Sequence, residues 1–264
     1  MLRQIQPGVG RMLALTYALP MVTFILVIAL WEAMVVGFGI PLYLLPAPSA
    51  IWEVFASQPA FLFRIGMTTF SQALSGFVIG CTLGILVAAI CVRWRVLARG
   101  LVPFSVASNA VPIVALSPLF GIWLGSTSPA SKIAVVAVMT FFPTLVNVFR
   151  GLTSPTPDAI QLLRSYAAPE HVIFFKLRLP ASLPYLFNAL KISATLSMIG
   201  AVVAEFFGGL RNSLGVYIKS EAGILHTREA WSAIVVASII GITFYTIIVI
   251  AERFVMPWYT ARQR

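Results

Sequence analysis

Charged residues are scarce in this chain. Its 264 residues include 18 lysines and arginines and only 8 aspartates and glutamates, so charged side chains make up 10% of the total. A soluble domain carries about 25% charged residues, and this smaller number cannot cover a globule of such length. Two cysteines are also too few for a small secreted disulfide scaffold. The composition therefore argues against a soluble enzyme, a disordered chain and a secreted disulfide-rich protein.

Sequence patterns of nucleotide-binding, metal-binding and catalytic sites are absent as well. The chain lacks the phosphate-binding pattern G-x-x-x-x-G-K-[ST], a His/Cys cluster at metal-ligand spacing and a plausible nucleophile–base pair. Cys81 and Cys91 lie ten residues apart in one expected helix, roughly 15 Å along its axis, so they cannot pair. The net charge of +10 is scattered in small groups, which argues against nucleic acid as a partner. We expect no catalytic residue, metal site or cofactor in this chain.

Apolar residues make up 59% of the sequence, and the mean hydropathy is +0.95. A helix that crosses a bilayer needs roughly 20 mostly apolar residues. The sequence therefore predicts an all-α polytopic membrane protein with about six transmembrane helices, forming a single domain over residues 1–264. The expected spans are 13–36, 67–92, 101–123, 132–150, 181–206 and 231–256. We also expect a short interfacial helix at 49–57 with Ser49 as its N-cap, and a polar loop at 207–230 that holds a short helix.

Lysines and arginines indicate the orientation, because they are enriched on the cytoplasmic side of membrane proteins. If the N-terminus is cytoplasmic, twelve basic residues fall inside and five outside, and Lys191 lies within a span. Six spans also return Arg262 and Arg264 to the inside. We expect a multi-pass protein with both termini in the cytoplasm.

The third expected span is unusual because it contains three prolines. Pro103, Pro112 and Pro118 each remove a backbone donor, and Asn109 and Ser117 add polar side chains. Freed backbone groups inside a membrane must be satisfied by protein or by a water-filled cavity. The segment is therefore expected to kink, either as part of a solute pathway or as a packing helix without solute contact.

The loop at 151–180 is the longest on the expected cytoplasmic side. Thr156-Pro157-Asp158 supplies a cap, a first-turn proline and an acid, which predicts a helix running to about Ala167. Ala168-Pro169-Glu170 predicts a second short helix at right angles to the first, whose apolar residues 172–175 should be packed. Such an ordered loop is either a docking element for a partner or a segment folded on its own membrane domain.

This loop resembles the "EAA" loop of permease subunits of ATP-binding-cassette importers. Counting back from Leu179-Pro180 places the glycine of the family pattern at Ala167 and its Glu-Ala-Ala at Gln161-Leu162-Leu163. Alanine in place of glycine means either that the turn needs no positive φ or that it adopts one at a cost. Further stretches are similar to the branch that imports nitrate, sulfonates, taurine and pyrimidine precursors: 44–55, 109–125, 141–152 and 178–209.

The resemblance implies the type I importer permease fold and a set of partners. These are a second permease copy, giving a homodimer, two cytoplasmic ATPase subunits that bind ATP and magnesium, an external solute-binding protein, and the lipid bilayer of a bacterial inner membrane. It also implies that the loop couples to the ATPases. The expected coupling residues are Gln161, Arg164, Ser165, Tyr166, Ala167, Ala168, Pro169 and Glu170.

Polar residues inside the expected spans are candidates for the translocation pathway. Lys191 must face a cavity or a partner unless its side chain reaches the interface, and Glu205 is either a gate or docking residue or a simple interfacial carboxylate. A mildly polar patch lies between them and either lines the pathway or joins helices. The pathway candidates are Asn109, Lys191, Ser193, Ser197, Met198 and Glu205, and Thr195 belongs to the same patch.

Two other classes of function stay open from the residues. A stand-alone secondary transporter or channel would usually show internal repeats or paired broken helices, and only one broken span is visible. A membrane enzyme or assembly scaffold would need a polar cluster at one membrane face. The expected function is a permease subunit for a small polar solute, and the resemblance favours a heterocycle such as a pyrimidine or riboflavin over a sulfonate-like compound.

Overall fold

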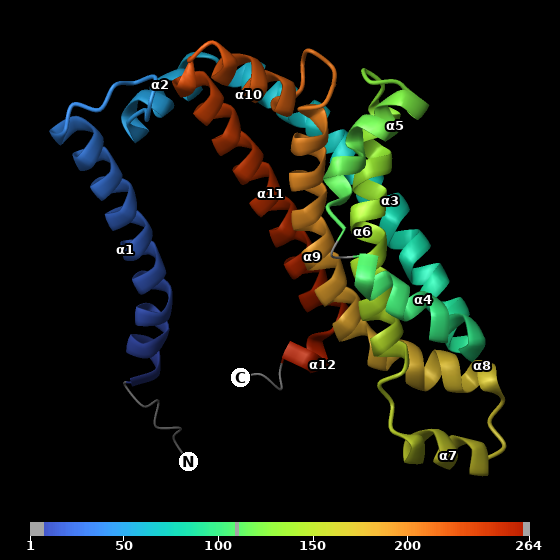
Figure 1. Ribbon diagram of the computed structural model, residues 1–264. Coiled ribbons are helices and arrows are strands. Elements are labelled where there is room, and N and C mark those ends of the chain that lie inside the picture. The colour runs from blue at the N-terminus through green and yellow to red at the C-terminus, as the bar shows by residue number, and fades with distance from the viewer. Residues whose placement is uncertain (1–7, 109–110, 261–264) are drawn as a thin grey trace. The chain divides into compact units, whose positions relative to one another are not determined.

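The computed structural model describes residues 8–108 and 111–260, and every regular element in these ranges is helical. The chain forms two compact units. One unit holds the described residues up to Pro59 together with Ser220–Ser232, and the other holds Ala60–Lys219 and the described residues from Ala233 onward. Figure 1 labels the helices of both.

The first unit contains α1 (Gly8–Gly37) and α2 (Pro48–Ser57). Glu32 of α1 accepts hydrogen bonds from the backbone N–H and the hydroxyl of Ser49, at 3.0 and 2.7 Å. The expectation that Ser49 is the N-cap of the short helix is wrong, because Ala47 is the N-cap. The carboxylate of α1 satisfies a donor at the start of α2 instead, as an acid at a helix N-terminus commonly does.

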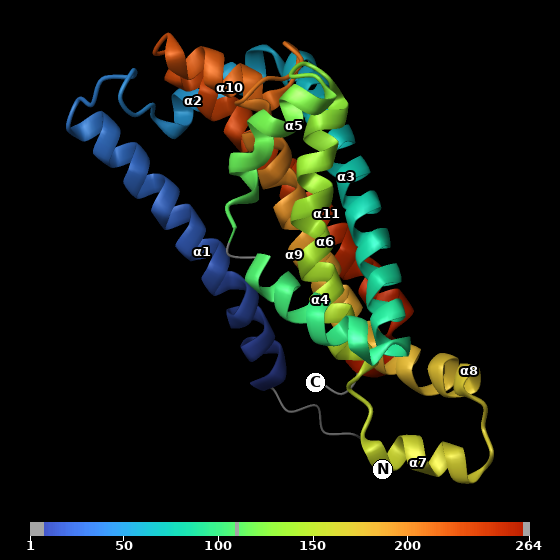
Figure 2. The ribbon, with the colours of Figure 1, turned by 45° about the vertical axis from the view of Figure 1, so that its right-hand side comes forward.

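The second unit is built on α3 (Pro59–Arg93), α6 (Pro129–Leu152), α9 (Leu179–Glu205) and α11 (Thr227–Val255), whose residues up to Ser232 belong to the first unit. Figures 1 and 2 show α3, α6 and α9 side by side. Gly76, Gly80 and Gly84 allow α3 to approach the backbone of α6 closely. A Cβ on Gly76 would lie 2.8 Å from the carbonyl oxygen of Ile133, and a Cβ on Gly80 would overlap that of Ala137. Small residues at this spacing are typical of membrane helix pairs.

Five helices within the described residues are long and apolar enough to cross a membrane. The third expected span, 101–123, is not one of them. It is divided into α4 (Arg95–Ser108), the 3-10 helix η1 (Ile113–Leu116) and α5 (Ser117–Leu124). The expected interruption is confirmed, and Pro112 and Pro118 flank η1 because each lacks the N–H that a continuous helix would use. Asn109 lies outside the described residues.

Shorter helices complete the second unit, and one of them, α10 (Leu214–Gly223), extends into the first unit. The loop holds α7 (Pro157–Ser165), and α8 (Glu170–Ile173) leads through a π-turn (Phe174–Arg178) into α9. The expected helix within 207–230 is α10 (Leu214–Gly223), and α12 (Pro257–Thr260) follows α11. We call the end of the second unit where α3 and α6 end the loop end, because α7 lies there (Figure 2).

Candidate functional site

Helix α7 begins as the sequence predicts. The Thr156 hydroxyl accepts a hydrogen bond from the Ala159 N–H at 3.4 Å, Pro157 occupies the first turn and Asp158 supplies the acid. The helix ends at Ser165, two residues before the predicted end. The N–H of Ala168 donates to the carbonyl of Leu163 at 3.1 Å, which closes the turn.

The turn after α7 uses a left-handed backbone at Ala167, whose φ is +55°. This is the position where the family pattern has glycine, so the second of the two alternatives, a positive φ at a cost, is the one observed. The left-handed region costs a residue with a Cβ about 1–2 kcal/mol. The loop therefore keeps a strained conformation that glycine would adopt freely.

The predicted second helix begins at Glu170, with Pro169 as its N-cap. Contrary to expectation, it does not end before α9 but continues through a π-turn into that helix. Residues Glu170–Glu205 form one continuous helical segment of 36 residues. The π-turn at Phe174–Arg178 precedes Pro180, which has no N–H to donate, so the segment bends here without losing its helical conformation (Figure 1). Ile173 is fully buried and Phe174 packs against the cluster of Ala88, Val148 and Leu152, as expected for this apolar stretch, whereas Phe175 is exposed.

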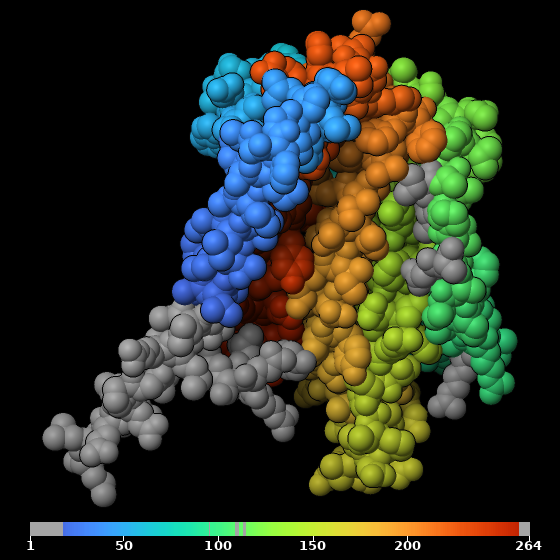
Figure 3. All heavy atoms as spheres, turned by 60° about the vertical axis from the view of Figure 1, so that its left-hand side comes forward, coloured from blue at the N-terminus to red at the C-terminus, as the bar shows by residue number. Residues whose placement is uncertain are grey.

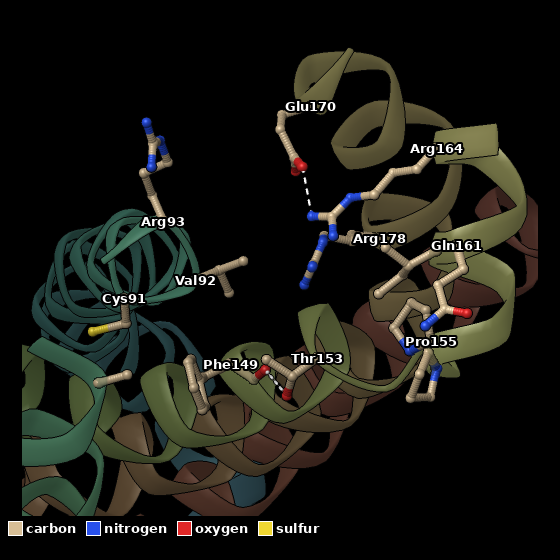
Figure 4. A pocket seen from close by; sticks show the side chains of 13 residues that line it. Cys91, Val92, Arg93, Phe149, Thr153, Pro155, Gln161, Arg164, Glu170 and Arg178 are labelled. Atoms are coloured by element: carbon tan, nitrogen blue, oxygen red, sulfur yellow. Dashed lines mark hydrogen bonds and ion pairs between the residues drawn. The ribbon is translucent and has the colours of Figure 1, made fainter. Parts of the chain in front are cut away.

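A cleft of about 700 Å³ lies between the loop and the loop end of the bundle (Figure 4). Three of the expected coupling residues, Gln161, Arg164 and Glu170, line it. Arg164 donates to Glu170 at 2.7 Å, and both side chains are largely exposed. Tyr166 is 76% exposed and does not line the cleft. The coupling candidates therefore lie in and around one turn. Some of them line the cleft, and others, such as Tyr166, lie on the surface of the loop away from it.

Lys191 has a partner within the second unit. Its Nζ lies 3.0 and 3.2 Å from the two carboxylate oxygens of Glu252, which joins α9 to α11. Both side chains are largely buried. The sequence left a cavity, a partner or the interface open for Lys191, and Glu252 was not singled out, although an acid inside the apolar segment 231–256 was a visible signal.

Glu205 is buried, with an exposed fraction of 1%, at the end of the second unit opposite the loop. Its carboxyl group accepts hydrogen bonds from the Thr69 hydroxyl at 3.1 Å, the Gln72 amide at 3.2 Å and the Gly215 N–H at 2.8 Å. Thr69 also accepts from the Leu214 N–H at 2.9 Å. Glu205 is thus a buried junction between α3, α9 and the start of α10. Nothing in the sequence spacing indicated Thr69 or Gln72 as its partners.

The residues of the polar patch between Lys191 and Glu205 lie on different faces of α9. Ser193 and Ser197 are fully buried; Ser193 lies 3.1 Å from the Thr144 hydroxyl of α6. Met198 packs with Ala73 and Val136. Thr195 is exposed instead and lies on a different face.

An uncharged groove of about 440 Å³ runs along α9, α10 and α11. Thr195 and Ser238 contribute the hydroxyl groups of its lining, and the remaining lining residues are apolar or glycine. Met198 is the pathway candidate that lines this groove. Figure 3 shows the face of the second unit on which α9 and α11 lie side by side.

Comparison with known proteins agrees with this architecture. Residues 80–260 match the family described as "Binding-protein-dependent transport system inner membrane component". The formylaminopyrimidine transport permease protein ThiX of Halalkalibacterium halodurans is 29% identical over 240 residues, which cover 90% of this chain and 95% of the relative. The riboflavin transport system permease protein RibX of Chloroflexus aurantiacus is 30% identical over 241 residues, covering 90% of this chain and 88% of the relative.

A relative named for a different solute also aligns along most of the chain. The putative aliphatic sulfonates transport permease protein SsuC of Bacillus subtilis is 26% identical over 235 residues, which cover 88% of this chain and 84% of the relative. The family match covers more than half of the chain, and the apolar helices fit a multi-pass inner-membrane protein. The chain belongs to the inner-membrane components of binding-protein-dependent transport systems, and it is a permease subunit of an ATP-binding-cassette importer.

Proposed function

We propose that this permease forms half of a translocation pathway, with a second copy of the chain as the other half. Two ATPase subunits bind ATP and magnesium, and each receives the loop of one permease. An external binding protein delivers the solute. The observation that carries this proposal is the capped helix α7 followed by an exposed, strained turn at Ala167, which is a fixed shape on an otherwise apolar protein. In this arrangement both termini and the loop are cytoplasmic, which the distribution of basic residues supports.

The outer surface of the loop is the contact with the ATPase. Leu162 and Tyr166 are 58% and 76% exposed, and Ser165 is exposed between them. Exposed large apolar side chains on an element outside the membrane are typical of a partner interface. Gln161, Arg164 and Glu170 lie on the cleft side of the loop, where Arg164 pairs with Glu170.

Coupling is tested with substitutions at the turn in the assembled, reconstituted transporter. Ala167→Arg keeps the left-handed position strained and adds a bulky charge, so we expect solute-stimulated ATP hydrolysis and uptake to fall at least about tenfold while the permease still assembles in the membrane. The matched control Ala167→Gly relieves the strain and should retain coupling. Unchanged uptake and ATPase stimulation in Ala167→Arg would count against the loop as the coupling element.

We propose a small uncharged heterocycle, such as a pyrimidine precursor or a flavin, as the solute. The groove along α9 and α11 has hydroxyl groups but no charged side chain in its lining, and an ion buried there would lose its hydration without a partner. The solutes in the names of ThiX and RibX support this class over the sulfonates of SsuC. Uptake of labelled formylaminopyrimidine, riboflavin and an alkanesulfonate by the complete transporter in vesicles separates the classes. Uptake of the sulfonate alone would refute the proposal.

A further inference from the structure

The cleft at the loop end has two chemically different halves (Figure 4). One half is apolar and comes from the ends of membrane helices, with Val92 of α3 and Phe149 of α6. The other half carries the guanidinium groups of Arg164 and Arg178, whereas Arg93 extends from the end of α3 on the apolar side and points away from them. An amphipathic lining of this kind fits an amphiphile better than a fully polar solute.

Positive charge exceeds negative charge in this lining. Glu170 is the acid among the lining residues and pairs with Arg164. Arg178 donates through Nη1 to the Leu152 carbonyl at 3.1 Å, which fixes its position and leaves its other N–H groups for a ligand. Arg93 forms no ion pair with any side chain in the described parts of the chain. Guanidinium groups held in this way favour a phosphate, which they can contact with two parallel hydrogen bonds.

The cleft also lies at the membrane boundary. Arg93 is the last residue of α3, and the next residues carry large apolar side chains that protein does not cover: Trp94 is 55% exposed and Val96 is 81% exposed. Such side chains lie in the interfacial and hydrocarbon regions of a bilayer, and basic pockets between helices at that depth bind lipid head groups.

We propose that this cleft binds the phosphate of an anionic phospholipid, with the acyl chains along the apolar half. The phosphate lies between Arg164 and Arg178, and the chains pass Val92 and Phe149 into the bilayer, with Arg93 at the rim. The shared chemistry is a phosphate group, and the apolar half assigns the lipid, not free phosphate, as its source. The outer surface of the loop, with Tyr166, stays open to the ATPase. The lipid therefore supports the loop from its inner side.

The test counts lipids bound to the purified transporter complex by native mass spectrometry. The complex is titrated with phosphatidylglycerol and, separately, with zwitterionic phosphatidylcholine. We expect selective binding of phosphatidylglycerol that weakens about fivefold in Arg178→Gln, about fivefold in Arg164→Gln and about 25-fold in the double variant. The matched control is Arg150→Gln, because Arg150 is exposed near the end of α6 but does not line the cleft.

Each outcome decides the proposal. Loss of phosphatidylglycerol in the cleft variants, with the control unchanged, supports it. Equal affinity for the two lipids, no loss in the double variant, or an equal loss in Arg150→Gln overturns it. Inorganic phosphate is added as a competitor at constant ionic strength; displacement of the lipid by phosphate but not by chloride would assign the site to a soluble phosphate and overturn the lipid assignment. Retention of the ATPase subunits in the same spectra shows that the variants are assembled, and binding is measured without transport, so failure of this inference leaves the proposed function untouched.

Discussion

Replacement of Thr69 by valine tests the buried junction at Glu205. Valine has nearly the shape of threonine, so the substitution removes the hydroxyl without leaving a cavity. Two buried hydrogen bonds are lost together: the one that Thr69 donates to Glu205 at 3.1 Å and the one that it accepts from the Leu214 N–H at 2.9 Å. The donated bond is worth about 1 kcal/mol, and the buried N–H left without a partner costs about 1–3 kcal/mol more. We expect Thr69→Val to lower the free energy of unfolding by about 3 kcal/mol.

The measurement is equilibrium unfolding of the permease in mixed micelles, followed by the loss of helical circular dichroism. Thr68→Val is the matched control, because the Thr68 hydroxyl donates only to the Arg64 carbonyl of its own helix, and it should change stability by less than about 0.5 kcal/mol. Thr69→Ser keeps the hydroxyl and should recover most of the loss. If Thr69→Val and Thr68→Val destabilise the protein equally, the hydrogen bonds of Thr69 to Glu205 and Leu214 do not contribute to stability, and the reasoning fails.

Three further experiments test other contacts. Gly80→Leu forces a side chain into the backbone of α6 and should cost about 3 kcal/mol in the same unfolding measurement, whereas Gly100→Leu meets no atom within 4 Å and should be nearly neutral. Ala167→Gly should stabilise the permease by about 1 kcal/mol, since glycine adopts a positive φ freely; a loss of stability would contradict the strain at this turn. A double-mutant cycle of Lys191→Met and Glu252→Gln should give a coupling energy of about 1–3 kcal/mol, and a value near zero would show that the two charges act independently.

The sequence predicted features that depend on local chemistry. The start of α7 follows from Thr156, Pro157 and Asp158, whose roles are complete within one turn of helix. The interruption of the third span likewise follows from prolines that lack a donor, wherever the segment lies in the molecule. The apolar spans were visible for a similar reason, because contact with lipid imposes hydropathy on each helix separately.

Contacts between helices could not be predicted from the sequence in the same way. The partner of Lys191 is 61 positions along the chain, and the partners of Glu205 in α3 are more than 130 positions away. Which face of α9 meets α6 decides that Ser193 is buried and Thr195 is exposed, and this depends on packing that a single helix does not specify. The continuity of the helix past Pro180 was missed because a π-turn has no clear sequence signature.

The uninterrupted segment from Glu170 to Glu205 has a mechanical consequence. The segment bends at the π-turn, so that α8 lies across the direction of α9 (Figure 1). The 27 residues of α9 extend over roughly 40 Å, enough to cross the bilayer. We expect a displacement of the loop to reach α9 through this bend and to tilt its far end, where Glu205 anchors the start of α10. The weak points of the segment are the π-turn at Phe174–Arg178 and the proline at Pro184, where the hydrogen-bond ladder is altered. Beyond Pro184 the helix has no further proline, so we expect its two ends to move together.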